Sequence, residues 1–235
     1  MAINLTSRSQ RQPVHGILLD VAETLFSLAS LHTMFEGCGL DAQLVPLWFA
    51  RVLRDGFALA AAGDYRRFTD VATSNFTALD PQRLGGTEAG MLLDCLQALE
   101  PYPDVERGLQ LMRDAGVRVM TLTNGEAALC EALFARAGLH GMVDGFLSAD
   151  TVRRWRPAPE PYTYAVAQIG WPPSNVAFIA ARAWDVHGAR RAGLQSALVV
   201  RPCAADLQPA APIFSAAHVT GDDLPAVVEQ LLSAK

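Results

Sequence analysis

Cysteine is scarce in this sequence, and long hydrophobic runs are missing from it. Four cysteines lie far apart in 235 residues, at Cys38, Cys95, Cys130 and Cys203. None belongs to a Cys-x-x-Cys pair or has a histidine at metal-ligand spacing, so reduced thiols in a cytoplasmic protein are expected. No stretch reaches the roughly 18 unbroken apolar residues of a membrane span. Residues 1–13 lack the apolar segment of a signal peptide. These absences argue against a membrane partner and predict a flexible terminus over residues 1–14.

An excess of positive charge is absent as well. The chain carries 19 lysines and arginines against 24 acidic residues, a formal net charge of −5. This balance gives no electrostatic reason to expect nucleic acid or an anionic membrane as a partner. Arginines do gather locally, in residues 153–156 and 182–191, where they indicate either local sites or ordinary solvated helix faces.

What the sequence does contain is an alternation of strand-like and helix-like segments. Short apolar runs are typical of strands covered on both faces. They fall at residues 16–20, 117–123, 145–149, 176–181 and 196–200. Helical patterns lie between them, at residues 104–116, 125–138, 159–170 and 183–193. Three of these patterns end in Ala-Gly, where a helix C-terminus favours glycine. The alternation predicts an α/β protein with a doubly wound parallel sheet.

Residues 28–98 differ in kind from the rest. Their pattern is helical throughout, and they interrupt the chain directly after the first strand. Two prolines and Asp104 mark the return, with Asp104 as the expected N-cap of the next helix. We therefore expect a core domain of residues 15–27 and 99–235. Residues 28–98 should form a helical cap domain over the carboxyl end of the first strand, where open α/β sheets bind ligands.

Polar residues stand at the ends of the predicted strands. In chain order they are Asp20, Thr123, Asn124, Arg156 and Asp185. Because the carboxyl ends of parallel strands open on one edge of a sheet, these side chains can converge there. Taken singly, each has an ordinary explanation, such as a cap, a turn or a surface position. Together, a nucleophile, a hydrogen-bond donor, a cation and a second acid form a catalytic constellation.

Four motifs carry a resemblance to a known family. They read LLDVAETLF, TLTNG, RWRPAPEPYTYA and FIAARAWDVHGARRAGL, and they run through nearly the whole chain. In this order they resemble the motifs of the haloacid dehalogenase superfamily, and within it those of 2-haloacid dehalogenases with a helical cap after the first strand. The last motif is the most specific, through Trp184, Asp185, Gly188, Ala189 and Gly193. The resemblance implies a Rossmann-like core and a hydrolase that needs no metal or other cofactor.

The resemblance also implies a carboxylate nucleophile, which divides one difficult displacement into two easier steps. Asp20 would attack the carbon that bears the halogen of a small 2-halocarboxylic acid and form an ester. Water positioned by Asp185 would then hydrolyse this ester at the aspartyl carbonyl. Thr24, Thr123 and Asn124 occupy further catalytic positions of the motifs.

Several positions depart from the pattern of the family. Arg156 stands where the family has a lysine, so it keeps the charge that holds the pKa of a nucleophilic carboxylate low but presents a planar fork. Phe49 occupies the position of a cap arginine that receives the halide. Ala180 and Arg182 replace a serine and an asparagine, and Glu23 replaces a glycine. Half of the expected substrate contacts have therefore changed.

Two of these changes introduce charge, at Glu23 and Arg182. Since a buried charge is costly unless it is paired, two roles are open for Arg182. It either pairs with Glu23, or it supplies the guanidinium that Phe49 no longer provides for the halide or the substrate carboxylate. The other expected substrate-binding residues are Ala22, Tyr162 and Trp184. Tyr162 fits a core aromatic on its helix equally well.

Two other functions stay open at this point. Phosphatases of the superfamily place acidic residues at the positions of Ala22 and Ala180 and use Mg²⁺, so these two alanines argue against phosphoryl transfer. Glu23 could contribute an unconventional oxygen to such a metal. The combined losses also fit a non-catalytic descendant that binds a small anion or a protein. The leading prediction is a hydrolase with a small anionic substrate, and a homodimer is one expected assembly because dimers are common in the family.

Overall fold

The computed structural model describes residues 11–201 and 213–233. The predictions for Cys203 and for residues 1–10 of the terminal segment lie outside this part of the chain. Cys38, Cys95 and Cys130 are free thiols, as expected. Within the described residues, no helix is long and apolar enough to cross a lipid bilayer.

A parallel sheet forms the centre of the molecule. Its strands are ordered β5-β4-β1-β6-β7-β8, and every neighbouring pair is parallel. Their bounds are β1 Gly16–Leu19, β4 Arg118–Thr123, β5 Gly145–Ser148, β6 Val176–Ala180, β7 Gln195–Val199 and β8 Val219–Gly221. Strand β1 lies between β4 and β6, so its carboxyl end opens in the middle of the sheet. The doubly wound α/β fold predicted from the sequence is confirmed.

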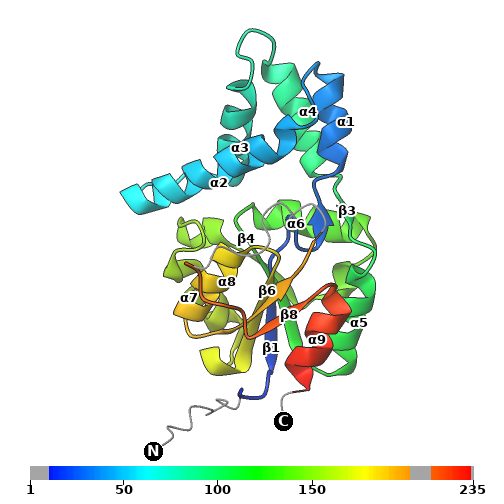
Figure 1. Cartoon of the computed structure of the whole chain (residues 1–235), viewed down its shortest axis with the longest axis vertical. Helices are drawn as coiled ribbons and strands as arrows, with labels where there is room; N and C mark the ends of the chain where they lie inside the picture. The colour runs from blue at the N-terminus through cyan, green and yellow to red at the C-terminus, as the bar shows by residue number, and fades with distance from the viewer. Residues whose placement is uncertain (1–10, 202–212, 234–235) are drawn as a thin grey trace, which may run out of the picture.

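Helices cover both faces of this sheet (Figure 1). Ile17 and Leu19 point to one face, where they join the core side chains of α5 (Val105–Asp114), α6 (Ala127–Arg136) and α9 (Leu224–Leu232). Leu18 points to the other face, where it packs with residues of α7 (Pro159–Ile169) and α8 (Ala183–Arg191). Burial on both faces explains why the strands read as continuous apolar runs. Short 3-10 helices complete the core at His140–Met142, Ala149–Val152 and Pro173–Asn175.

Four helices form the cap, which stands above the sheet in Figure 1. They are α1 Ser30–Gly37, α2 Leu44–Ala62, α3 Phe68–Thr77 and α4 Gly86–Leu96. The chain leaves and re-enters the core through a two-residue antiparallel pair, β2 (Phe26–Ser27) with β3 (Glu100–Pro101). The helical segment predicted after the first strand therefore lies over the carboxyl edge of the sheet, between β2 and β3.

The structure also departs from the sequence predictions. Strand β8 and helix α9 were not expected, although both pack against core elements. Asp104 does stand at the N-cap position of α5, but its side chain makes no capping bond. Both of its carboxylate oxygens accept hydrogen bonds from Arg201 Nη1, each at 2.8 Å, and one also accepts from the Leu224 amide. The position predicted for Asp104 as N-cap residue is therefore confirmed, but its side chain binds a distant arginine instead of capping the helix.

The cap and core touch closely at Gly56 of α2. A Cβ atom on this glycine would lie 2.2 Å from Cε3 of Trp155. The indole is fully buried, and its Nε1 donates to the carbonyl of Arg66 at 2.9 Å. The bulky ring cannot move aside without breaking this bond, so only glycine fits at position 56.

Gly56→Ala is expected to lower the free energy of unfolding by about 1–3 kcal/mol through overpacking. Gly90→Ala in α4 is the matched control, because a Cβ there meets nothing within 4 Å. That control should gain about 0.5–1 kcal/mol, as expected for alanine in a helix. Chemical denaturation of both variants measures the difference, and equal stabilities would contradict the close packing.

Candidate active site

Asp20 follows directly on β1 and points into the space below the cap. Its Oδ2 accepts a hydrogen bond from Thr24 Oγ1 at 2.6 Å, and its Oδ1 accepts one from Arg156 Nη2 at 2.7 Å. Thr24 is itself fixed, because its hydroxyl oxygen accepts from the amide of Ala181 at 2.9 Å. Both carboxylate oxygens of Asp20 are thus oriented by fixed donors, which is what a carboxylate nucleophile requires.

Arg156 connects the two acids that the sequence placed at strand ends. Nη2 reaches Asp20, and Nη1 donates to Oδ2 of Asp185. The arginine is only 2% exposed. Burial by itself would lower the pKa of this guanidinium, but the carboxylates of Asp185 and Asp20 raise it above its ordinary value. A permanent cation therefore lies between two buried carboxyl groups.

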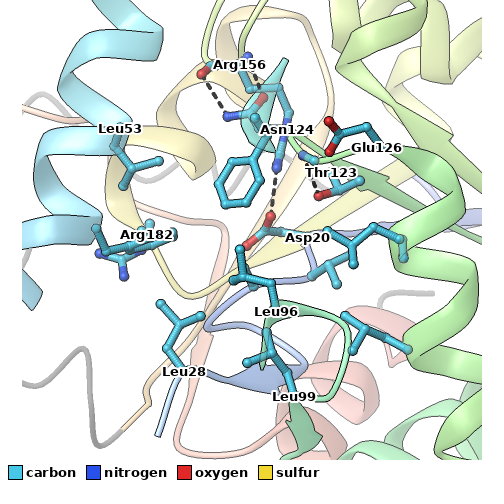
Figure 2. Close-up of a pocket in the computed structure, with 18 of the residues that line it drawn as sticks. Asp20, Leu28, Leu53, Leu96, Leu99, Thr123, Asn124, Glu126, Arg156 and Arg182 are labelled. Carbon is cyan, nitrogen blue, oxygen red and sulfur yellow. Dashed lines mark hydrogen bonds and ion pairs between the residues drawn. The ribbon is translucent and has the colours of Figure 1, made fainter. Parts of the chain in front are cut away.

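The side chain of Asn124 holds Arg156 in place by binding the backbone of Arg156. The side-chain oxygen of Asn124 accepts from the Arg156 amide at 2.9 Å, and its Nδ2 donates to the Arg156 carbonyl at 3.3 Å (Figure 2). Thr123 accepts a hydrogen bond from the amide of Gly125 at 3.0 Å, which shapes the turn after β4. Asn124 thus fixes the loop that carries the cation, and both residues also line the cavity above Asp20.

Asp185 is fully buried behind Arg156. Its Oδ1 accepts a hydrogen bond from the hydroxyl of Tyr162, and that hydroxyl also donates to the Asp185 carbonyl at 3.2 Å. Burial raises the pKa of Asp185 to about 7, with Asp20 adding to the rise and Arg156 opposing it. Gly188 permits this arrangement, because a Cβ there would lie 2.6 Å from the Tyr162 hydroxyl oxygen.

Tyr162 does not have the place that was expected of a substrate-binding residue. It is fully buried, and its ring packs edge-on against Phe178 at 5.5 Å, outside the wall of the cavity. Its contact with the site runs through Asp185. The prediction of direct substrate binding is corrected to a supporting position behind the second acid.

A cavity opens above Asp20 between the cap and the core. Its volume is about 50 Å³, room for only a few water-sized groups. Predicted residues in its wall, besides Asp20 and Arg156, are Ala22, Phe49, Thr123, Asn124, Arg182 and Trp184. The rest of the wall is mostly apolar and was not predicted: Val21, Leu28, Leu53, Phe68, Leu96, Leu99, Leu129, Cys130 and Leu133. Most of these side chains come from the cap and from α6, so only tertiary packing could reveal them.

Glu23 and Arg182 lie close together, as the hypothesis that they form an ion pair requires. Arg182 Nη2 is 3.9 Å from Glu23 Oε2, a loose ion pair between side chains that are 11% and 6% exposed. The other Glu23 oxygen accepts from the Leu28 amide at 2.8 Å. Arg182 also lies over the ring of Phe49, with 5.0 Å from Cζ to the centroid. The arginine therefore contacts Glu23 and the cavity at once.

Glu126 is a site residue that the sequence reasoning missed. It lies in the cavity wall just after the Thr123-Asn124-Gly125 turn, and its Oε1 accepts from Thr69 of the cap at 2.6 Å. Its other carboxylate oxygen, Oε2, is buried and has no hydrogen-bond partner in the part of the chain that the structure describes. One indication of this role was present in the sequence, because Glu126 directly follows the TLTNG motif.

The residues present do not fit a magnesium ion. Both Asp20 oxygens already accept from Thr24 and Arg156, and Ala22 and Ala180 offer no side-chain oxygen. Glu23 is turned toward Leu28 and Arg182. Within residues 11–201 and 213–233, no group of three or more acidic, histidine or cysteine side chains could hold a metal. A cation that wants six oxygens would find too few here.

Comparisons with known proteins place this geometry in a family. The profile of the haloacid dehalogenase-like hydrolases matches residues 14–193. The chain is 28% identical over 191 residues to an (S)-2-haloacid dehalogenase of Burkholderia cepacia, covering 80% of each protein. A dehalogenase crystal structure with an intermediate complex is 25% identical, with a TM-score of 0.84 over 94% of this chain and 98% of the other.

A third relative is the L-2-haloacid dehalogenase of Xanthobacter autotrophicus with chloropropionic acid covalently bound. It is 23% identical and covers 94% of this chain and 100% of its own, with a TM-score of 0.83, which shows the shared fold. The chain belongs to the haloacid dehalogenase-like hydrolases, and the family predicted from its motifs is confirmed.

Proposed function

We propose that this protein hydrolyses the carbon–halogen bond of a small 2-halocarboxylic acid through an ester on Asp20, without a metal ion. The observation that carries the proposal is the geometry of Asp20. Its carboxylate is held by Thr24 and Arg156 at the floor of a small, mostly apolar cavity. The names of the curated relatives support the choice of reaction, and the small volume of the cavity supports a small substrate.

In the first step an oxygen of Asp20 attacks the carbon that bears the halogen. The new carbon–oxygen bond forms as the carbon–halogen bond breaks, and the halide leaves with the bonding electron pair. Arg156 orients Asp20 through the hydrogen bond from Nη2 to Oδ1. The apolar walls exclude bulk water, which leaves the nucleophile weakly solvated.

In the second step water attacks the aspartyl carbonyl of the ester. Asp185 takes a proton from this water, and the bond between Asp20 Cγ and the ester oxygen breaks with its electron pair going to that oxygen. Asp185 gives the proton to the ester oxygen, so the product is a 2-hydroxy acid. The second proton of the water passes to solvent, and Asp20 returns as a carboxylate. Both Asp185 oxygens already accept hydrogen bonds from Arg156 and Tyr162, but a carboxylate oxygen has two acceptor sites and can take one more donor.

The pH dependence of turnover follows from the raised pKa of Asp185. Only ionised Asp185 accepts a proton, so kcat should fall as the pH drops through about 7. Tyr162→Phe removes a donor that stabilises the charged form, so the acid limb should move to higher pH. Stopped-flow halide release across the pH range measures both profiles. An unchanged limb in Tyr162→Phe would argue against Asp185 as the base.

Halide release from bromoacetate and from each enantiomer of 2-chloropropionate, measured in EDTA, tests the proposed reaction. Release that EDTA does not reduce is the expected result. A folded protein that releases no halide, but frees phosphate from a phosphate ester only with added Mg²⁺, would overturn it.

A further inference from the structure

Arg182 brings a second cation to the cavity, separate from Arg156. It is the N-cap residue of α8, two residues after the last residue of β6, and its side chain lies in the cavity wall beside Leu53 and Leu28 (Figure 2). In this view Asp20 lies between Arg182 on one side and Thr123 and Glu126 on the other. The two ends of the cavity therefore carry opposite charges.

The guanidinium of Arg182 is incompletely satisfied. Its Nε is buried and has no hydrogen-bond partner among residues 11–201 and 213–233, and its contact with Glu23 is a long 3.9 Å. An arginine presents five N–H donors in a fixed fork. Burying such a cation is expensive when so few of its donors are used. The remaining donors are available to a ligand in the cavity.

Glu23 does not fill the fork of Arg182, because its Oε2 stays 3.9 Å from Nη2. One of its oxygens is held by the Leu28 amide at 2.8 Å, and its backbone has a φ of 64°. That left-handed conformation is unfavourable for a residue with a side chain. Glu23 thus balances the charge of Arg182 without saturating its hydrogen bonds, and a carboxylate from a ligand can still bind the guanidinium.

We propose that Arg182 binds the carboxylate of the substrate. This inference rests on the proposed function and names the group that orients the substrate over Asp20. A planar carboxylate matches the guanidinium fork, whereas a spherical halide does not use it. At the other end of the cavity the unpartnered Oε2 of Glu126 repels a second anion. The substrate carboxylate is therefore favoured only at the Arg182 end of the cavity. There the ring of Phe49, from cap helix α2, packs against the guanidinium.

Binding of propionate, which has no halogen to lose, tests this role directly. Isothermal titration calorimetry of the full chain should show propionate binding that Arg182→Gln weakens by about 10- to 150-fold, as expected for loss of a charged hydrogen-bonded pair. Arg182→Lys keeps the charge but not the fork and should fall in between. Arg54→Gln is the control, because Arg54 is exposed and pairs with its neighbour Asp55, and this variant should bind like the parent protein.

A bromide titration separates the two anions of the reaction. Arg182→Gln should leave bromide binding unchanged if the arginine serves the carboxylate. Weakened bromide binding with intact propionate binding would assign Arg182 to the halide and overturn the proposal, as would propionate that fails to bind the parent protein or binds Arg182→Gln equally well. The double variant Glu23→Gly/Arg182→Gln leaves no unpaired acid, so it repeats the test if the single variant folds poorly.

These titrations need no turnover. If the protein binds propionate through Arg182 but releases no halide, the proposed reaction is overturned and the proposed binding site is retained. If halide release persists in Arg182→Gln with an unchanged KM, the proposed reaction would stand and the binding role of Arg182 would be overturned.

Discussion

Asp20→Asn should abolish halide release, with a fall in kcat of at least about 10⁴-fold, in line with removal of other enzymatic nucleophiles. The substitution is nearly isosteric. Its amide oxygen can still accept from Arg156, and its NH₂ group faces the hydroxyl oxygen of Thr24. The fold should therefore persist, and a melting temperature close to that of the parent protein is the control.

A labelling experiment tests directly whether Asp20 forms an ester. In a single turnover in H₂¹⁸O, water attacks the aspartyl carbonyl, so the heavy oxygen should enter Asp20 and not the 2-hydroxy acid. Mass spectrometry of the peptide that contains Asp20 measures the label. Label found only in the product would mean that water displaces the halide directly, and the ester mechanism would be wrong.

Arg156→Met should cause the largest loss of stability, about 3–5 kcal/mol at neutral pH, because it leaves two buried carboxylates without their shared cation. Asp20 and Asp185 contact opposite sides of this guanidinium, and Asp185 has no solvent exposure. Arg54→Met, at an exposed ion pair, should cost less than about 1 kcal/mol. Urea denaturation of both variants compares them.

The loss in Arg156→Met should also depend on pH. Burial already raises the pKa of Asp185 to about 7 in the parent protein, with Arg156 opposing the rise, so without the cation this pKa should lie higher still. A group with a raised folded pKa loses its stabilising contribution as the pH rises through that pKa. Below about pH 7 both proteins lose this contribution alike, so the gap to the parent protein should widen as the pH rises above about 7. Arg156→Lys, which restores the residue of the family, should retain more stability than Arg156→Met.

Strand ends were the most informative part of the sequence. A parallel sheet must bring the carboxyl ends of its strands to one edge, so Asp20, Thr123, Arg156 and Asp185 could be grouped from their positions alone. Their contacts could not be assigned in this way. Nothing local indicates that Arg156 bridges both acids or that Tyr162 turns its hydroxyl to Asp185, because these contacts depend on how α7 and α8 pack beside β6.

Most of the missed features share one cause. Strand β8 is three residues long and pairs only with β7 among the described strands. Asp104 serves a distant arginine instead of its own helix. The apolar cavity wall comes mostly from the cap and from α6, whose sequences read as ordinary core. Each of these depends on a partner remote in the chain, which periodicity and local propensity do not record. Helix α9 is different, because Asp223 caps it and a proline stands in its first turn, so local signals for it were present.

The Glu23–Arg182 pair constrains the order in which this site can have diverged from its relatives. A glutamate at position 23 without the arginine would hold an unpaired buried acid on a left-handed backbone, which combines two penalties. An arginine at position 182 beside a glycine would hold a buried cation without its acid, but the glycine would adopt the left-handed backbone without strain. The intermediate with Arg182 alone thus carries one penalty where the intermediate with Glu23 alone carries two. A mutational path through the more stable intermediate therefore acquires Arg182 first, and a reversion removes Glu23 first.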